Sequence, residues 1–215
     1  MVLGVYGSGG AGKIVKDIVI EQNQWEEVVF IDDTVSEDVY KGVRRMSFSK
    51  LCEEFKTNEI EIIIALGEPK YKKMLYDKVK EAGYSLGNVI HRTALVSKEA
   101  LLGKGVLINA GAVISADAVI EDNVSIEEYS IVSHDSIVHA HAQISAFVMI
   151  AGHCEVGEGT YIGLNVPVKE NVKIGAHSVV GMGSVVLRDI PDGVTAMGNP
   201  AKVMLKRSEE DRVFK

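Results

Sequence analysis

The stretch INAGAVISADAVIEDNVSI, residues 108–126, runs through the same six-residue pattern three times. The pattern continues on both sides, from Ile90 to Ile190. The first residue of each hexad is Ile, Val or Leu, and the fifth is small or β-branched. Seventeen consecutive hexads obey both rules.

This period excludes an α-helix, because a six-residue step would scatter the large residues around a 3.6-residue turn. It fits a chain that turns after each short strand and keeps one large residue inward per hexad, which is a parallel β-helix. In known hexapeptide-repeat proteins three such faces make a coil of eighteen residues, and the coils are left-handed. By that resemblance we predict about six left-handed coils, stacked at about 4.8 Å.

Length and composition limit the class of protein. The 215 residues predict two domains, one at 1–88 and one at 89–215 that holds the hexads and a short tail. A net charge of −7 argues against nucleic acid as a partner. Two cysteines, Cys52 and Cys154, make no disulfide framework, and no apolar run suits a signal peptide or a membrane span. We therefore expect a cytoplasmic protein that does not bind membranes.

Residues 1–88 alternate predicted strands and helices, which is typical of a parallel α/β sheet. We expect strands at 2–6, 28–31 and 60–66, and helices at 14–20, 47–55 and 71–81. The first helix should bury Ile14, Val15, Ile18 and Val19 on one side. At this length the domain is half of a doubly wound, Rossmann-like fold. We interpret the charged tail after Lys202 as a helix.

A glycine-rich loop follows the first predicted strand. Gly7, Gly9 and Gly12 fit G-x-G-x-x-G, and Asp32 ends the second strand twenty residues after Gly12. Such a loop lets backbone N–H groups approach a phosphate, and the carboxylate can hold a ribose hydroxyl. We therefore favour nucleotide binding over a purely structural turn. The loop also fits a P-loop, but Ile14 stands where an NTPase needs Ser or Thr.

The pair His134-Asp135 is the candidate catalytic group. An imidazole can take a proton from an amine or hydroxyl, and a neighbouring carboxylate can orient the ring and stabilise the imidazolium. Eighteen residues on, Gly152 would lie one coil above with an exposed backbone N–H that suits an oxyanion, and His153 would lie over Asp135. The residues alone leave open an ordinary polar corner at this place.

Six histidines raise the question of a metal site: His91, His134, His139, His141, His153 and His177. His134 and His139 have the spacing that zinc-dependent hexapeptide carbonic anhydrases use. Zinc catalysis needs three ligands and an open position, whereas we expect His139 and His141 to point into water. We therefore predict no metal site.

Taken together, these residues resemble a known family, the hexapeptide-repeat acyltransferases related to the sialic-acid O-acetyltransferase NeuD and the bacillosamine-pathway N-acetyltransferase PglD. The resemblance covers the whole chain. It is carried by Val5-Tyr6-Gly7 with the glycine loop, Phe30-Ile31-Asp32-Asp33, His134-Asp135, Ala151-Gly152 and Gly198-Asn199-Pro200-Ala201-Lys202. The hexads are typical of the superfamily, and the α/β domain before them is typical of the family.

The resemblance implies a homotrimer with active sites between neighbouring β-helices and acetyl-CoA as co-substrate. His134 would be the general base and Asp135 its partner, with direct transfer and no covalent enzyme intermediate. Contacts to the coenzyme would come from Gly152, Gly163, Leu164, Gly181, Met182, Gly198 and Pro200. Contacts to a nucleotide-activated sugar would come from Gly9, Gly10, Asp32, Asp33 and Gly67.

Two positions depart from the family pattern. Relatives usually carry His where this chain has Ala11, and that His helps to seat the sugar nucleotide. Relatives also often carry His where this chain has Gln143, which can donate a hydrogen bond but carries no charge. We count both positions among the substrate-binding candidates, and both changes bear on which sugar is accepted.

We therefore interpret the chain as an acetyl-CoA-dependent transferase that acts on an amino or hydroxyl group of a sugar in surface-glycan biosynthesis. Two other classes remain open at this point. One is a non-catalytic hexapeptide scaffold or nucleotide-binding module, and the other is a zinc-dependent lyase.

Overall fold

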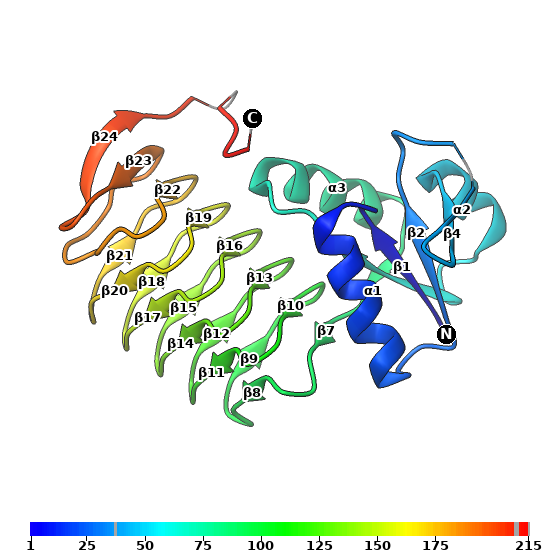
Figure 1. Ribbon diagram of the computed structural model, residues 1–215, viewed down its shortest axis with the longest axis horizontal. Helices are drawn as coiled ribbons and strands as arrows, with labels where there is room; N and C mark the ends of the chain where they lie inside the picture. The colour runs from blue at the N-terminus through cyan, green and yellow to red at the C-terminus, as the bar shows by residue number, and fades with distance from the viewer. Residues whose placement is uncertain (37, 209–210, 215) are drawn as a thin grey trace. The chain divides into compact units, whose positions relative to one another are not determined.

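The structure is a computed structural model that describes residues 1–36, 38–208 and 211–214. The chain divides into two compact units, each with its own sheets and core (Figure 1). The first unit comprises Met1–Gly67 and Tyr71–Val89, and the second comprises Glu68–Lys70 and Ile90–Lys215. Among the helices of the described residues, none is long and apolar enough to cross a membrane.

The first unit is built on a six-stranded sheet with the order β3-β4-β2-β1-β5-β6. The strands are β1 (Val2–Tyr6), β2 (Glu27–Ile31), β3 (Asp38–Tyr40), β4 (Val43–Met46), β5 (Ile60–Ile64) and β6 (Ser85–Leu86). All neighbours are parallel except β3 and β4, which form an antiparallel hairpin. The helices are α1 (Gly10–Gln22), α2 (Phe48–Glu54) and α3 (Pro69–Glu81). The three predicted strands and three predicted helices are confirmed.

Two details of this unit differ from the prediction. Helix α1 buries Val15, Ile18 and Val19, but Ile14 is 41% exposed because it lies at the edge of that narrow stripe. The β3–β4 hairpin was not predicted, because its strands are short and their polar residues hide the alternation.

The second unit is a left-handed parallel β-helix, as predicted. Its strands are β7 (Val89–Ile90), β8 (Leu95–Val96), β9 (Leu101–Leu102), β10 (Leu107–Ile108), β11 (Val113–Ile114), β12 (Val119–Ile120), β13 (Ser125–Ile126), β14 (Ile131–Val132), β15 (Ile137–Val138), β16 (Gln143–Ile144), β17 (Met149–Ile150), β18 (Glu155–Val156), β19 (Tyr161–Ile162), β20 (Pro167–Val168), β21 (Lys173–Ile174) and β22 (Val179–Val180). Each strand ends on the first residue of a hexad, which is the residue that enters the core. Val113 pairs with Ile131, so one coil takes eighteen residues.

The strands form three walls. The first wall has the order β24-β23-β22-β19-β16-β13-β10-β7, the second β20-β17-β14-β11-β8, and the third β21-β18-β15-β12-β9. Figure 1 shows the coils stacked side by side. The last coil is shorter than predicted, because Ile174 pairs with Ile190, only sixteen residues later. Ile190 therefore takes a strand position in the third wall rather than a corner position.

The corners explain why the hexad tolerates polar residues. From residue 105 to residue 183, one residue of each corner has a positive φ: Asp117, Asn123, Tyr129, Asp135, His141, Phe147, His153, Asn165, Asn171 and His177, with glycine at 105, 111, 159 and 183. Where the small residue beside it is Ser or Thr, its hydroxyl closes the corner by hydrogen bonds between coils. Ser130 Oγ, for example, donates to Ser145 O and accepts from Val148 N. Some of these corners, such as that of Asp135, project polar side chains into solvent, whereas Asn123 and His141 are buried.

The C-terminal part of the described chain differs from the predicted helix. The β-helix ends in β23 (Val194–Met197), and β24 (Lys202–Lys206) pairs with it in antiparallel orientation. The helix prediction for the tail was wrong. Strand β23 would otherwise leave an open row of backbone N–H and C=O groups, which the tail covers.

Candidate functional site

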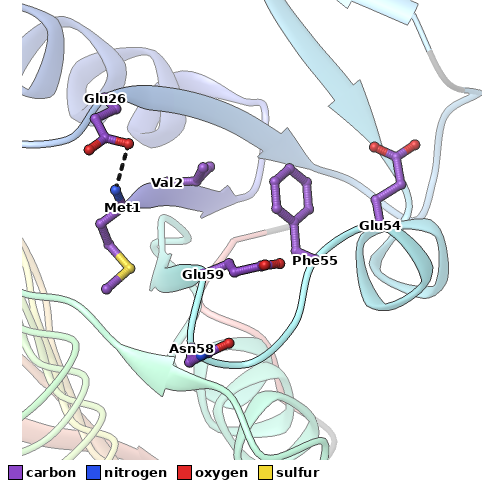
Figure 2. Close-up of a pocket in the computed structure, with 7 residues that line it drawn as sticks. All are labelled: Met1, Val2, Glu26, Glu54, Phe55, Asn58 and Glu59. Carbon is purple, nitrogen blue, oxygen red and sulfur yellow. Dashed lines mark ion pairs between the residues drawn. The ribbon is translucent and has the colours of Figure 1, made fainter.

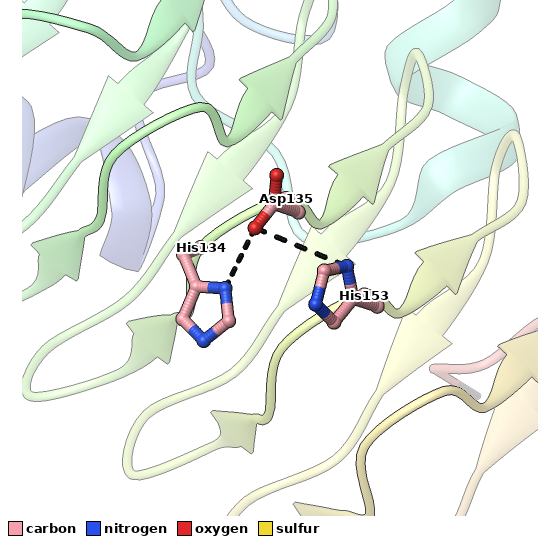
Figure 3. A group of neighbouring side chains, drawn as sticks. All are labelled: His134, Asp135 and His153. Carbon is pink, nitrogen blue, oxygen red and sulfur yellow. Dashed lines mark hydrogen bonds and ion pairs between the residues drawn. The ribbon is translucent and has the colours of Figure 1, made fainter.

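His134 and Asp135 lie at the corner between the second and third walls, between β14 and β15. His134 Nδ1 lies 2.7 Å from Asp135 Oδ2, and the two side chains are 58% and 45% exposed. Asp135 takes the positive-φ place of this corner, with φ of 57°. The carboxylate therefore holds the Nδ1 side of the imidazole, and Nε2 faces away from it (Figure 3).

The ring of His134 covers Gly152 of the next coil. A Cβ atom on Gly152 would come within 2.7 Å of His134 Cε1 and 2.9 Å of Nε2, so a larger residue would displace the ring. His153 N donates to His134 O at 3.1 Å, which fixes the two coils at this corner. The predicted stacking is confirmed. Gly152 is buried, however, so the prediction of an exposed backbone at this position is wrong; the ring above it excludes solvent.

His153 completes this corner. Its Nδ1 lies 3.9 Å from Asp135 Oδ2, and its ring meets the ring of His134 edge-on, with 5.1 Å between the centroids. One carboxylate thus lies between two imidazoles (Figure 3). The expected place of His153 over Asp135 is confirmed.

We predicted that the other two histidines of this region, His139 and His141, would point into water, and this prediction is wrong. His139, on the third wall, lies between two carboxylates, with Nδ1 3.1 Å from Glu121 and Nε2 3.1 Å from Glu155. Burial disfavours its charged form, but the hydrogen bonds to the two glutamates outweigh burial and raise the pKa of His139. His141 is buried, and its Nδ1 lies 3.0 Å from Asn123 Nδ2. The structure therefore does not bring His134 and His139 together at one carboxylate.

The predicted coenzyme contacts other than Gly152 gather at a different corner, between the first and second walls. They are Gly163, Leu164, Gly181, Met182, Gly198 and Pro200. Gly183 N donates to Leu164 O at 2.8 Å, and a Cβ atom on Gly163 would lie 2.7 Å from Met182 N. Val185 N donates to Gly198 O at 3.0 Å. Within one chain, this Leu164 corner and the His134 corner lie on opposite edges of the second wall.

Gln143 lies at neither of these two corners but on the first wall. It starts β16 on the first wall, its side chain is 2% exposed, and its Nε2 donates to Glu127 Oε1 at 2.8 Å. The prediction that Gln143 binds substrate is not supported by this position. Its place on the first wall, half a coil after His134, lies away from the exposed corner of His134.

The glycine loop between β1 and α1 has two kinds of glycine. Gly7 has φ of 113°, and a Cβ atom on Gly12 would lie 1.9 Å from Gly7 O, so these two are required by the turn itself. A Cβ atom added to Gly9 or Gly10 would meet no protein atom within 4 Å. Of the residues described, none in the first turn of α1 is acidic, and no side chain caps its N-terminus. The loop therefore leaves open space beside backbone N–H groups.

The two aspartates that follow β2 have different surroundings. Asp32 accepts hydrogen bonds from Ser8 Oγ and Thr34 Oγ1; burial opposes its ionisation, but these bonds outweigh burial and lower the pKa of Asp32. Asp33 accepts from Tyr6 OH, from Lys78 Nζ at 2.7 Å and from the Phe48 backbone N at 2.7 Å. Asp33 thereby ties β1, α2 and α3 together, which is a structural role.

Three residues beside the loop were missed by sequence reasoning. Arg45 Nη1 lies 3.2 Å from Ser8 Oγ, and its guanidinium lies 4.6 Å from the ring of Tyr40. Lys13 Nζ lies 5.7 Å from the same ring. Arg45 also pairs with Asp38 at 2.6 Å. The only signal in the sequence was Lys13 after Gly12; the hairpin that carries Tyr40 and Arg45 was not predicted, so their approach to the loop could not be seen.

The first unit also has a hollow of about 480 Å³ at the opposite end of β1. It is lined by Met1, Val2, Glu26, Glu54, Phe55, Asn58 and Glu59 (Figure 2). The N-terminal ammonium pairs with Glu26 at 2.9 Å. The hollow lies where β1 begins, whereas the glycine loop lies where β1 ends. The carboxylates that line the hollow would repel a phosphate.

Proteins of known structure share the fold of this chain. Residues 2–79 match the family described as PglD N-terminal domain. Over its whole length the chain is similar to the acetyltransferase domain of PglB from Neisseria gonorrhoeae, with 30% sequence identity, a TM-score of 0.89, and coverage of 94% of this chain and 99% of that one. The chain belongs to the PglD-like family of hexapeptide-repeat sugar acyltransferases.

Two further solved structures of similar chains widen the comparison for this PglD-like acyltransferase. PerB from Caulobacter crescentus, in complex with CoA and GDP-perosamine, has 31% identity and a TM-score of 0.86, with coverage of 95% of this chain and 97% of that one. WeeI from Acinetobacter baumannii has 26% identity and a TM-score of 0.88, with coverage of 94% and 99%. The PglB domain is also known in complex with acetyl coenzyme A. The resemblance drawn from the sequence is thus confirmed.

Proposed function

We propose that this acyltransferase moves an acetyl group from acetyl-CoA to an amino or hydroxyl group of a nucleotide-activated sugar, in the cytoplasm and for surface-glycan biosynthesis. The observation that carries this proposal is the exposed His134-Asp135 pair over Gly152, on a chain whose similar structures bind acetyl coenzyme A, or CoA with GDP-perosamine. Those complexes contain both kinds of ligand that the two units would need.

In the proposed mechanism His134 is the general base. Asp135 holds the proton of the ring on Nδ1, so Nε2 offers a lone pair to the acceptor. His134 takes the proton of the amine or hydroxyl as that group attacks the thioester carbonyl, and Asp135 stabilises the imidazolium. When the carbon–sulfur bond breaks, His134 returns the proton to the departing thiolate. No covalent enzyme intermediate is needed.

The Gly152 N–H would be the donor to the tetrahedral oxyanion. Since the ring of His134 covers this glycine, a substrate that engages Nε2 also approaches the backbone of residue 152. Any side chain at this position would displace the ring, which accounts for a glycine where the corner pattern does not require one.

The proposed assembly is a homotrimer, because the two groups of site residues lie on opposite edges of the second wall. The outward residues of that wall are Leu95, Val113, Ile131, Met149 and Pro167, all apolar, and Leu95 and Met149 are 67% and 55% exposed. A second copy of this chain would cover that wall. It would bring the Leu164 corner of one copy to the His134 corner of its neighbour, so that the coenzyme could reach the base.

The nucleotide sugar would bind at the glycine loop. Gly9 and Gly10 leave room for a diphosphate beside the start of α1, and Lys13 and Arg45 supply positive charge there. Asp32 would hold a ribose hydroxyl. Ala11 and Gly67 are partly exposed and would belong to the same binding site. Asp33 is left out, because its hydrogen bonds serve the fold.

The test is a thiol-release assay with acetyl-CoA against a panel of UDP-, GDP-, CMP- and dTDP-linked amino sugars and sugars. With at least one acceptor, the protein should release CoA at a rate well above that with acetyl-CoA alone. Lys13→Ala should raise the KM for that acceptor. Nucleotide sugars that raise the melting temperature without any thiol release would instead favour the nucleotide-binding module.

A further inference from the structure

The corner of His134, Asp135 and His153 has a second property that acyl transfer does not use. Each of the three side chains offers one ligand atom, and these atoms all lie within 4.8 Å of one another. His134 Nδ1 is 2.7 Å and His153 Nδ1 is 3.9 Å from Asp135 Oδ2. All three residues are exposed, so an ion from solution can reach them (Figure 3).

This arrangement suits a divalent cation of the zinc type. Zinc accepts imidazole nitrogen and carboxylate oxygen at about 2.0–2.2 Å in a tetrahedron, which places two ligand atoms about 3.3 Å apart. The distances from Asp135 Oδ2 lie on either side of that value, and no two ligand atoms are more than 4.8 Å apart, so side-chain movements of up to about 1.5 Å would close the site. Two imidazoles and one carboxylate leave a fourth position for water.

The backbone at this corner is fixed, which lowers the cost of arranging the ligands. Asp135 and His153 occupy equivalent positive-φ positions on adjacent coils, with φ of 57° and 58°. His153 N donates to His134 O, and Cys154 N donates to Ser136 Oγ. The two histidines are therefore held on neighbouring coils before any ion binds.

We propose that this corner is an inhibitory zinc site. Zinc on His134 Nδ1 takes the place of the proton that Asp135 otherwise holds there. The neutral ring then carries its proton on Nε2, and the lone pair that would accept the acceptor's proton is gone. The inhibitory part rests on the proposed function of His134, whereas binding of the ion rests on the three ligands alone.

The first experiment measures binding without turnover. Metal-free protein is titrated with Co²⁺, and the visible absorption of a tetrahedral cobalt centre is followed; Zn²⁺ should displace the cobalt and remove the absorption. His153→Gln should abolish the absorption. His177→Gln is the matched control, because His177 is an exposed histidine at another positive-φ corner and should leave the absorption intact.

The second experiment measures acetyl transfer with added Zn²⁺. Saturating zinc should lower turnover about 100-fold, within the usual contribution of a general base, and a chelator should restore it. In His153→Gln, added zinc should no longer lower the turnover relative to the rate of the same variant without zinc. Equal inhibition of this variant and the parent chain, or no cobalt absorption in the parent chain, would overturn the proposal. Cobalt absorption in a protein that shows no acetyl transfer even when metal-free would overturn the proposed function and leave the metal site standing.

Discussion

His134 and His139 are five residues apart in the chain, and each imidazole lies beside carboxylates, yet their surroundings differ. His134 stands at a corner, is 58% exposed and has one carboxylate at Nδ1. His139 stands on the third wall, is 30% exposed and has a carboxylate at each nitrogen, Glu121 and Glu155. Both nitrogens of His139 are thus engaged by the fold, whereas His134 keeps Nε2 on the side away from Asp135.

The difference shows how the coil assigns chemistry. The corner of His134 and Asp135 projects from a turn with positive φ at Asp135, and both side chains reach solvent there. His139 lies between Glu121, at the equivalent position of the coil before it, and Glu155, which is in register with Ile137 on the coil after it. Glu155 is itself paired with Lys173 at 2.8 Å. On the wall, His139 therefore takes part in a ladder of ion pairs, whereas at the corner His134 is the candidate reactive group.

The largest expected effect comes from exchanging the two histidines for alanine in turn. His134→Ala should lower kcat about 1000-fold, because it removes the general base, and should leave the melting temperature unchanged. His139→Ala is the matched control and should keep kcat within about threefold. Steady-state kinetics and thermal unfolding of both variants decide the matter. Near-normal turnover of His134→Ala would contradict the assignment.

Asp135→Asn should lower kcat about 100-fold, because the neutral amide no longer stabilises the imidazolium or fixes the ring tautomer. The comparable change on the wall, Glu155→Gln, should not alter kcat. KM for acetyl-CoA should stay nearly constant in both variants. A similar loss of kcat in the two would mean that the carboxylates act only on the fold.

The wall histidine should instead reveal itself in stability. The folded-state pKa of His139 is raised above its ordinary value of 6.5, so the stabilisation is fully present below pH 6.5 and is lost as pH rises through the folded pKa. His139→Gln should therefore lower the free energy of unfolding by about 0.5 kcal/mol at pH 6 and by less at pH 9. Urea unfolding at the two pH values measures this. A deficit that grows with pH would contradict the ion-pair ladder.

The smallest effect is expected at Cys154, the inward neighbour of His153. Its thiol is buried and donates to Lys169 O at 3.1 Å, and burial raises the pKa of Cys154. Cys154→Ala should keep kcat within about twofold, because direct transfer needs no thiol nucleophile. Thiol reagents should label the exposed Cys52 but not Cys154 in the folded protein. Loss of turnover in this variant would point to an acyl-cysteine intermediate.

Much of the β-helix was available from the sequence, because one residue in six must enter a narrow core and the count is unbroken. The same count correctly placed Gly152 over His134. The count failed for Ile190, because the last coil is two residues shorter than the others. It also did not show that Gln143, on the first wall, is buried. A periodic sequence gives the step along the chain but not the surface that covers each face.

The sequence by itself determined the α/β alternation, the hexad coils, the glycine loop and the pair His134-Asp135, because each depends on short-range spacing. Tertiary structure alone decided that Arg45 reaches Ser8 and that Asp33 joins β1 to α2 and α3. These contacts depend on distances between segments remote in the chain. Side-chain length, turn geometry and burial set those distances, and no local pattern in the sequence records them.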